Sequence, residues 1–389
     1  MNPFVRFWSL RRILKRRRLL GCLILVALVM APLVCALIFS ESMIEGITNK
    51  YIYLSDGHLQ ISNFSEPDIT YDASLIYSMD EVTSGYALMY SATSTSSVQI
   101  KGVSSSYFNE KRLSQITLET AELEQSNLNG IAISRTTANA LGVSLGDRVA
   151  LMIVPDTSKA TVRPVLVRIE AIFYSGYDQL DQLLAFVDLS YAKTLFTSSC
   201  ATSCEIIVQD AYMENLDEVI EALNLPVARV STWDEYNVSV YSNFITSKQM
   251  ILIILLLVVV VAAFYTASVA QQMVQDDIKP ISIAKLIGMS DSMVRVSVFM
   301  SVTLVTILGM LLGLALGIGI GYALGPVLSQ LSRLGLESLS FYLLDFEVTI
   351  PWKTVLLLSA CLLALSCMAV WLTLRKTRKI TPIRLFSIS

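Results

Sequence analysis

The chain has 389 residues and a formal net charge of −3, and its composition is 54% hydrophobic and 16% charged. Its single histidine, His58, excludes a His-rich zinc site and allows a Ser-His-Asp triad only if that one residue serves it. The sequence has no Gly-x-x-x-x-Gly-Lys-Ser/Thr stretch, which excludes P-loop binding of nucleotides by this chain.

Four apolar runs dominate the hydropathy pattern, and each is close to the ~20 residues that a helix needs to cross hydrocarbon. They are Leu19–Phe39, Met250–Ser268, Val296–Leu324 and Val355–Leu374. The first run is longer than the about 7–15 apolar residues of a secretory signal, so it is predicted to be a span. No run has a charged residue in its central part, which disfavours ion-driven transport. The sequence predicts an α-helical membrane protein with four transmembrane helices in a 1+3 arrangement.

Lysines and arginines flank the first and last runs, and such residues stay on the cytoplasmic side. Both termini are therefore expected in the cytoplasm, with the chain in the inner (cytoplasmic) membrane. The predicted sections are a basic amphipathic N-terminus (1–18), the first span (19–41), a periplasmic α+β domain with helical stalks (42–247), the second span (248–270), a cytoplasmic loop (271–295), the third span (296–325), an extracytoplasmic loop (326–353), the fourth span (354–374) and a basic cytoplasmic tail (375–389).

The large segment between the first two spans is acidic and has mixed periodicity. It contains 25 acidic and 11 basic residues between Ser42 and Ser247, which argues against nucleic acid as a partner. Its periodicity predicts a short helix at 131–141 closed by Gly142, strands at 147–154, 165–173 and 183–187, and helices at 190–196 and 213–223. These elements predict an α+β domain.

Two helical stalks are expected to join this domain to the spans. Thr232 and Glu235 have the spacing of a capping box, which predicts a helix that runs unbroken into the second span. The first span is expected to continue as a helix to about Tyr51. Such stalks either carry force or serve only as tethers. His58 is expected at a turn or a strand edge, where a histidine is partly exposed.

The domain also carries Cys200 and Cys204 in the sequence Cys-Ala-Thr-Ser-Cys. In an oxidising compartment this pair can form a disulfide. The alternative is two reduced thiols in a loop.

The third span carries five glycines, each four residues after the last: Gly309, Gly313, Gly317, Gly321 and Gly325. At this spacing they line one helix face and allow another helix backbone to approach closely. The partner is either another span of this chain or a second copy. In the loop at 271–295, Pro280 suits a first helical turn, Ile283 and Ile287 share one face, and Gly288 can end the helix. This short amphipathic helix either points into the cytosol or lies on the membrane surface.

Several of these stretches resemble a known family. The 1+3 arrangement, the loop Ile-Ser-Ile-Ala-Lys-Leu-Ile-Gly-Met at 281–289 and the closing Lys-Ile-Thr-Pro-Ile-Arg-Leu-Phe at 379–386 resemble the permease subunits of mechanotransmitting ABC transporters, the FtsX/MacB-like superfamily. Segments 131–134, 141–149, 169–173, 184–189 and 342–352 are most similar to the lipoprotein-releasing (LolC/LolE-type) branch. The resemblance covers nearly the whole chain.

The resemblance implies a non-catalytic permease that pairs with a second copy or a paralogue and with two ATPase subunits. These subunits would bind ATP and Mg²⁺, so this chain would hold no cofactor and no metal. The complex would extract lipoproteins from the membrane and pass them to a periplasmic carrier. The residues implied in ATPase coupling are Ile281, Ile283, Ala284, Lys285, Leu286, Ile287 and Gly288.

The lipoprotein-releasing branch also implies a loop that recruits the carrier. Its counterpart here runs from Pro155 to Pro164 and offers Lys159 and Arg163 as cations. Two alternatives stay open. One is a related MacB-like or FtsX-like permease for efflux or envelope regulation. The other, from a different class, is a membrane-anchored scaffold or sensor that binds partners without coupling to an ATPase.

Overall fold

The computed structural model describes residues 17–62, 64, 74–118, 130–153, 164–196, 201–213, 215–223, 230–277, 281, 283, 289–333 and 348–376. The chain forms two compact units. We call the first the membrane unit; it comprises Met1–Met43, Phe244–Leu328 and Glu347–Ser389. We call the second the α+β domain; it comprises Ile44–Asn243 and Ser329–Phe346.

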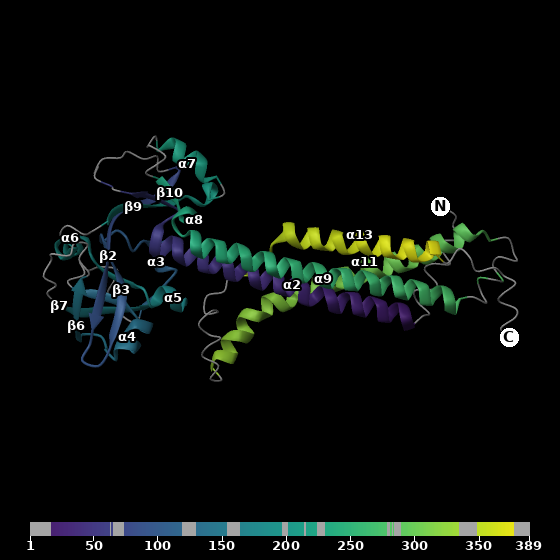
Figure 1. Cartoon of the computed structure of the whole chain (residues 1–389), viewed down its shortest axis with the longest axis horizontal. Coiled ribbons are helices and arrows are strands. Elements are labelled where there is room, and N and C mark those ends of the chain that lie inside the picture. Colours follow the sequence, from purple (N-terminus) through teal and green to yellow (C-terminus); the bar gives the residue numbers. More distant parts are fainter. Residues whose placement is uncertain are drawn as a thin grey trace. The chain divides into compact units, whose positions relative to one another are not determined.

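Four long helices build the membrane unit, and each is long and apolar enough to cross a membrane. They are α2 (Arg17–Lys50), α9 (Val238–Asp276), α11 (Asp291–Arg333) and α13 (Trp352–Lys376). The four pack side by side around one shared apolar core (Figure 1). The four predicted spans and the 1+3 arrangement are thereby confirmed. The helices extend beyond the predicted spans because their polar turns continue the same backbone hydrogen-bonding pattern.

Polar side chains at the ends of the apolar windows join these helices. Lys248 Nζ of α9 lies 2.7 Å from Glu41 Oε1 of α2. The Ser42 hydroxyl of α2 accepts a hydrogen bond from the Thr349 N–H, just before α13, at 2.9 Å. The Lys248–Glu41 pair is partly exposed and contributes little stability by itself.

The α+β domain contains a ten-stranded sheet with short helices on it (Figure 1). The strands are β1 (Leu59–Ser62), β2 (Ile76–Tyr90), β3 (Thr95–Val103), β4 (Thr117–Leu118), β5 (Ile131–Ser134), β6 (Arg148–Ile153), β7 (Val165–Tyr174), β8 (Leu184–Asp188), β9 (Ala201–Val208) and β10 (Val230–Thr232). The helices are η1 (Tyr51–Asp56, a π-helix), α3 (Glu110–Leu113), α4 (Arg135–Leu141), α5 (Asp178–Asp181), α6 (Leu189–Phe196), η2 (Asp210–Tyr212), α7 (Leu216–Ala222) and α8 (Trp233–Tyr236).

The strand order is β10-β1-β9-β2-β3-β8-β5-β7-β4, and β6 pairs with both β2 and β7. Two apolar cores lie along this sheet. One is built from β2, β3 and β5–β8 together with α4 and α6. The other is built from β1, β9, β10, α7 and the beginning of β2. The long strand β2 therefore contributes to both.

Close packing of α6 on the sheet depends on a glycine. A Cβ added to Gly102 of β3 would lie 2.2 Å from the Cβ of Ala192 in α6. Real Cβ atoms do not approach this closely, so α6 can sit here only because position 102 has no side chain.

Most of the predicted elements of this domain are confirmed: the strands as β6, β7 and β8, and the helices as α6 and α7. The helix predicted over 131–141 is wrong in its first part, because residues 131–134 form β5 between β7 and β8. The helix begins after Ser134, whose side chain accepts a hydrogen bond from the Thr137 N–H. Gly142 ends it in the left-handed conformation, as predicted.

Candidate functional site

The first stalk ends in a turn whose carbonyl groups need partners. α2 continues into η1, and the chain then turns at Gly57, whose φ of 72° suits glycine. The last carbonyls of a helix have no partners within it. The Gly57 N–H donates a hydrogen bond to the Ile52 carbonyl at 2.8 Å. Side chains from distant parts of the domain satisfy those of Tyr53, Leu54 and Ser55.

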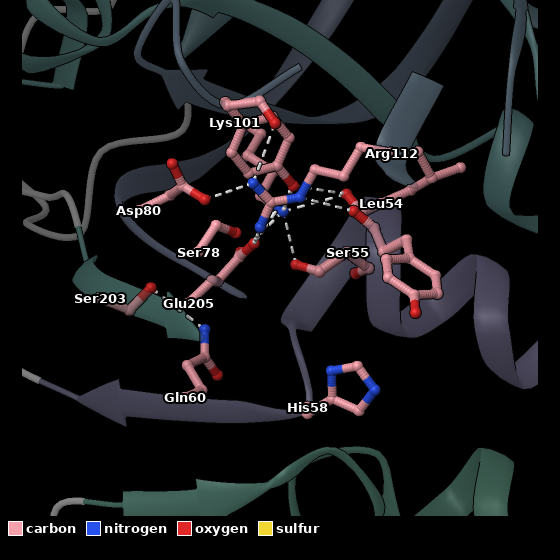
Figure 2. Close-up of polar contacts among 12 residues, drawn as sticks. Leu54, Ser55, His58, Gln60, Ser78, Asp80, Lys101, Arg112, Ser203 and Glu205 are labelled. Atoms are coloured by element: carbon pink, nitrogen blue, oxygen red, sulfur yellow. Dashed lines mark hydrogen bonds and ion pairs between the residues drawn. The ribbon is translucent and has the colours of Figure 1, made fainter. Parts of the chain in front are cut away.

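Three side chains donate to these carbonyls (Figure 2). Lys101 Nζ lies 3.0 Å from the carbonyl oxygen of Leu54 and 2.6 Å from that of Ser55. The Tyr107 hydroxyl shares the Leu54 carbonyl at 3.2 Å. Arg112 Nε donates to the Tyr53 carbonyl at 3.0 Å. Positive groups at a helix C-terminus also interact favourably with the helix dipole. Lys101 and Arg112 therefore stabilise the stalk end both by hydrogen bonds and by their charge.

Two carboxylates balance these cations. Asp80 of β2 and Glu205 of β9 are direct neighbours in the sheet register. Like charges in that position repel each other. Arg112 Nη1 lies 2.5 Å from Asp80 Oδ2, and its Nη2 lies 3.5 Å from Glu205 Oε2. Lys101 Nζ lies 2.7 Å from Glu205 Oε1. We call Asp80, Lys101, Tyr107, Arg112 and Glu205 the stalk clamp.

The stalk clamp is almost completely removed from solvent. Arg112 is 0% exposed, Glu205 1% and Lys101 2%. Burial raises the pKa of Glu205 and lowers that of Lys101, and the ion pair between the two opposes both shifts. Burial also raises the pKa of Tyr107 well above its usual value, so its hydroxyl keeps its proton and donates. A buried group of this kind fixes one geometry rather than exchanging protons with solvent.

The second stalk is tied to the end of the first. The side-chain amide of Asn237 donates to Asp56 Oδ2 at 2.8 Å, and Asp56 is the last residue of η1. The predicted capping box of Thr232 and Glu235 is confirmed. The prediction of an unbroken helix is wrong, because α8 ends at Tyr236 and α9 begins at Val238. Asn237 lies at the break, with φ −105° and ψ 44°.

His58 follows the turn at Gly57, but it is buried rather than partly exposed. The side chain is 4% exposed, and its Nδ1 accepts a hydrogen bond from the Val208 N–H at 3.3 Å. Its ring makes an edge contact with Tyr53. Burial, with a contribution from Lys111, lowers the pKa of His58 to about 4. The exposure was mispredicted because β9, which contacts the His58 ring through Val208, lies 150 residues later in the sequence.

Replacing His58 by asparagine is expected to weaken the pH dependence of stability below neutrality. The unfolded imidazole titrates near 6.5 and the folded one near 4, so the unfolded state binds more protons between these values. His58 therefore removes up to about 3 kcal/mol of stability as the pH falls from 6.5 to 4 and leaves it constant above 6.5. The asparagine amide oxygen can still accept from the Val208 N–H.

The measurement is hydrogen exchange of β9 in the full chain at several pH values, corrected for intrinsic rates. Burial raises the pKa of Asp181 to about 6, and that shift acts in the opposite direction. The difference between wild type and variant cancels such common contributions. Equal pH profiles for the two proteins would contradict the assignment.

The glycine stripe predicted in the third span lies against α2 of the same chain. A Cβ on Gly313 would lie 2.5 Å from Met30 Cβ, and one on Gly317 would lie 2.7 Å from Val34 Cβ. Gly309 and Gly321 face the same helix. The sequence left open whether the partner is another span of this chain or a second copy. At these four glycines the partner is the first span of the same chain. Gly325 also lies in α11.

Other predicted site residues are only partly described. In the coupling loop, Ile281 and Ile283 are helical; Ile281 is buried and Ile283 is 59% exposed. Ala284, Lys285, Leu286, Ile287 and Gly288 lie outside the described residues. Pro155, Lys159 and Arg163 of the carrier loop also lie outside them, whereas Pro164 is exposed just before β7.

The disulfide prediction stays open. Cys204 is buried in β9, and burial raises its pKa to about 12. Cys200 lies outside the described residues. Within the part of the chain that the structure describes, no group of three His, Cys, Asp or Glu side chains is placed to hold a metal ion.

Sequence reasoning missed the stalk clamp. The available signal was a charged residue inside a short apolar run, as in Ile-Lys-Gly-Val around Lys101 and Cys-Glu-Ile-Ile-Val around Glu205. Such a residue in a buried strand needs a partner of opposite charge. The sequence does not show which of the distant charges supplies that partner.

Comparison with known proteins bears on the membrane unit. Residues 252–382 match the family model described as FtsX-like permease C-terminal. The match covers 131 of the 389 residues, about a third of the chain. FtsX-like permeases are generally non-catalytic membrane subunits that work with ABC ATPase partners.

No curated protein matches the chain. Among solved structures, it is similar to the extracellular domain of the noncanonic ABC-type transporter YknZ from Gram-positive bacteria. The identity is 14% and the TM-score 0.26, and the alignment covers 42% of this chain and 88% of that one.

Proposed function

We propose that this chain is the force-transmitting permease of an ABC transporter that releases lipoproteins from the inner membrane to a periplasmic carrier. ATP and Mg²⁺ are bound by a partner ATPase dimer, and a second permease copy or paralogue completes the complex. Both termini and the coupling loop face the cytoplasm. Hydrolysis moves the α+β domain through the two stalks.

The observation that carries this proposal is the fixed end of the stalks. The first stalk is helical from Arg17 to Asp56, and the stalk clamp bonds its last carbonyls. The second stalk is hydrogen-bonded to Asp56 through Asn237. A helix bonded in this way moves together with the sheet that supplies the donors. A flexible tether would need neither buried ion pairs nor a hydrogen bond between the stalks.

The proposed contact with the ATPase is the coupling loop. Ile283 exposes 59% of its surface and Ile281 is buried, so the loop offers an apolar side chain next to an anchored one. Exposed apolar side chains of this kind suit a groove on a partner protein. Lipoprotein as the cargo rests on the resemblance of residues 131–134, 141–149, 169–173, 184–189 and 342–352 to the lipoprotein-releasing branch.

An uncoupling variant tests the proposal. Asn237→Leu removes the hydrogen bond between the stalks while leaving the stalk clamp intact. In vesicles that contain the permease, its ATPase and a lipoprotein, we expect lipoprotein release to fall sharply while ATP hydrolysis continues. Release to a soluble carrier and phosphate production are measured in the same sample.

The control is Lys193→Met, which breaks an exposed ion pair with Glu81 in the same domain and is expected to leave release unchanged. The proposal fails if Asn237→Leu releases lipoprotein as well as wild type does, or if no ATPase co-purifies with the chain. Depletion that leaves lipoproteins correctly sorted would overturn the cargo assignment alone.

A further inference from the structure

A groove of about 370 Å³ lies between two helices of the membrane unit, where α11 begins and α13 ends. This volume is within the range of small-ligand sites. The groove is lined by Ser292, Arg295, Val296, Phe299, Trp371, Leu374 and Arg375. None of these residues belongs to the stalks, to the glycine stripe or to the residues implied in ATPase coupling (281–288).

The spacing of the lining residues places them on one face of each helix. On α11 they follow the pattern i, i+3, i+4, i+7 from Ser292, and on α13 the pattern i, i+3, i+4 from Trp371. The two faces each present one arginine beside apolar side chains. The groove is therefore amphipathic, with cations and an apolar wall in the same cavity.

Neither arginine has an anionic partner within the part of the chain that the structure describes. Arg375 lies over the ring of Trp371, with its guanidinium carbon 5.4 Å from the ring centroid, and Arg295 is half-buried. Asp291, one turn before Arg295, is the nearest carboxylate along α11 and lies outside the lining. Two guanidinium groups at one cavity favour a ligand with a phosphate or carboxylate group.

The position of the groove narrows this choice. It lies at the ends of two membrane-spanning helices, where tryptophan and arginine side chains meet lipid headgroups. The apolar wall of Val296, Phe299 and Leu374 fits a hydrocarbon chain, which a small soluble anion lacks. The chain's basic termini carry the same charge as the arginines and are poor occupants.

We propose that this groove binds one anionic phospholipid. The phosphate lies between Arg295 and Arg375, and an acyl chain follows Val296 and Phe299. The bound lipid joins the beginning of α11 to the end of α13 at the membrane surface.

Native mass spectrometry of the full chain tests this assignment. The probes are phosphatidylglycerol, phosphatidylcholine and inorganic phosphate, each added to delipidated protein. We expect retention of phosphatidylglycerol, and a loss of that retention of about tenfold or more in Arg295→Gln/Arg375→Gln, because each cation near a headgroup contributes about 1 kcal/mol. Arg295→Lys/Arg375→Lys keeps both charges and is expected to retain most of the binding.

The matched control is Lys353→Gln, which removes one charge at the opposite end of α13. It is expected to bind phosphatidylglycerol as wild type does. Equal retention of phosphatidylcholine, or equal loss in the control, would overturn the proposal. Inorganic phosphate that displaces the lipid would show a headgroup site without an acyl-chain site and would also overturn it.

A photoreactive residue in place of Val296 separates lipid from protein occupants. In native membranes we expect it to cross-link to phospholipid. A cross-link to a polypeptide, such as an acidic segment of a partner subunit, would overturn the assignment to lipid.

Discussion

Replacing Arg112 by methionine is expected to lower the free energy of unfolding of the α+β domain by about 3–5 kcal/mol, the cost of breaking a buried ion pair. Asp80 would then lose its cation while facing Glu205 across β2 and β9, and Glu205 would keep only Lys101. The Tyr53 carbonyl at the stalk end would also lose its donor. The loss therefore affects both the sheet and the stalk.

The neighbouring residue supplies the control. Lys111 pairs with Asp210 at 2.5 Å, but the Asp210 side chain is 76% exposed. Lys111→Met is therefore expected to change stability by less than about 1 kcal/mol. Hydrogen exchange of β2 and β9 in the full chain reports both variants, because these strands carry the two carboxylates.

A charge-neutral combination distinguishes repulsion from lost packing. Adding Asp80→Asn to Arg112→Met removes the carboxylate left without a partner, keeps the Lys101–Glu205 pair, and is expected to recover part of the stability. If the double variant is as unstable as Arg112→Met alone, the loss arises from packing of the guanidinium rather than from the paired charges. Equal stability of Arg112→Met and Lys111→Met would contradict the role of the stalk clamp.

The second large effect is expected at the glycine stripe. A leucine at position 313 would place its Cβ 2.5 Å from Met30 Cβ and 2.9 Å from the Ala27 carbonyl oxygen of α2. Because backbone cannot yield as a flexible side chain does, α2 and α11 must separate. We expect a loss of about 1–3 kcal/mol or more from overpacking, together with loss of close helix contact.

Gly319 is a matched control on the same helix, because a Cβ there meets nothing within 4 Å. Gly319→Leu is expected to unfold at about the wild-type temperature in detergent, whereas Gly313→Leu unfolds at a lower one. Thermal unfolding of the three proteins in one detergent is the measurement. Similar melting temperatures for the two leucine variants would show that the α2–α11 contact does not limit stability.

Local pattern and hydropathy predicted much of the fold. The four spans follow from runs of about 20 apolar residues, and β6, β7 and β8 follow from short apolar segments. The helix start was misplaced at 131–134, because an apolar run of that length suits either a strand or a helix. Pairing with β7 and β8 decides the matter, and those strands lie 30 or more residues later.

The candidate site was far less predictable. Lys101 and Glu205 are 104 residues apart in the sequence, and only the register of β2, β3 and β9 brings them within 2.7 Å. Asp56 and Asn237 are 181 residues apart. The glycine stripe was visible from sequence because its four-residue repeat is local, but its partner helix was not.

The length of β2 has a consequence for how the α+β domain responds to load. Its beginning, at Ile76, belongs to the core of β1 and β9, and Ala87 and Met89 belong to the core of β5–β8. Asp80, held by Arg112, lies between these two regions on the same strand. A displacement of the clamped turn therefore moves both halves of the sheet, because β2 is one continuous strand through both. Neither half can move alone without breaking hydrogen bonds along β2.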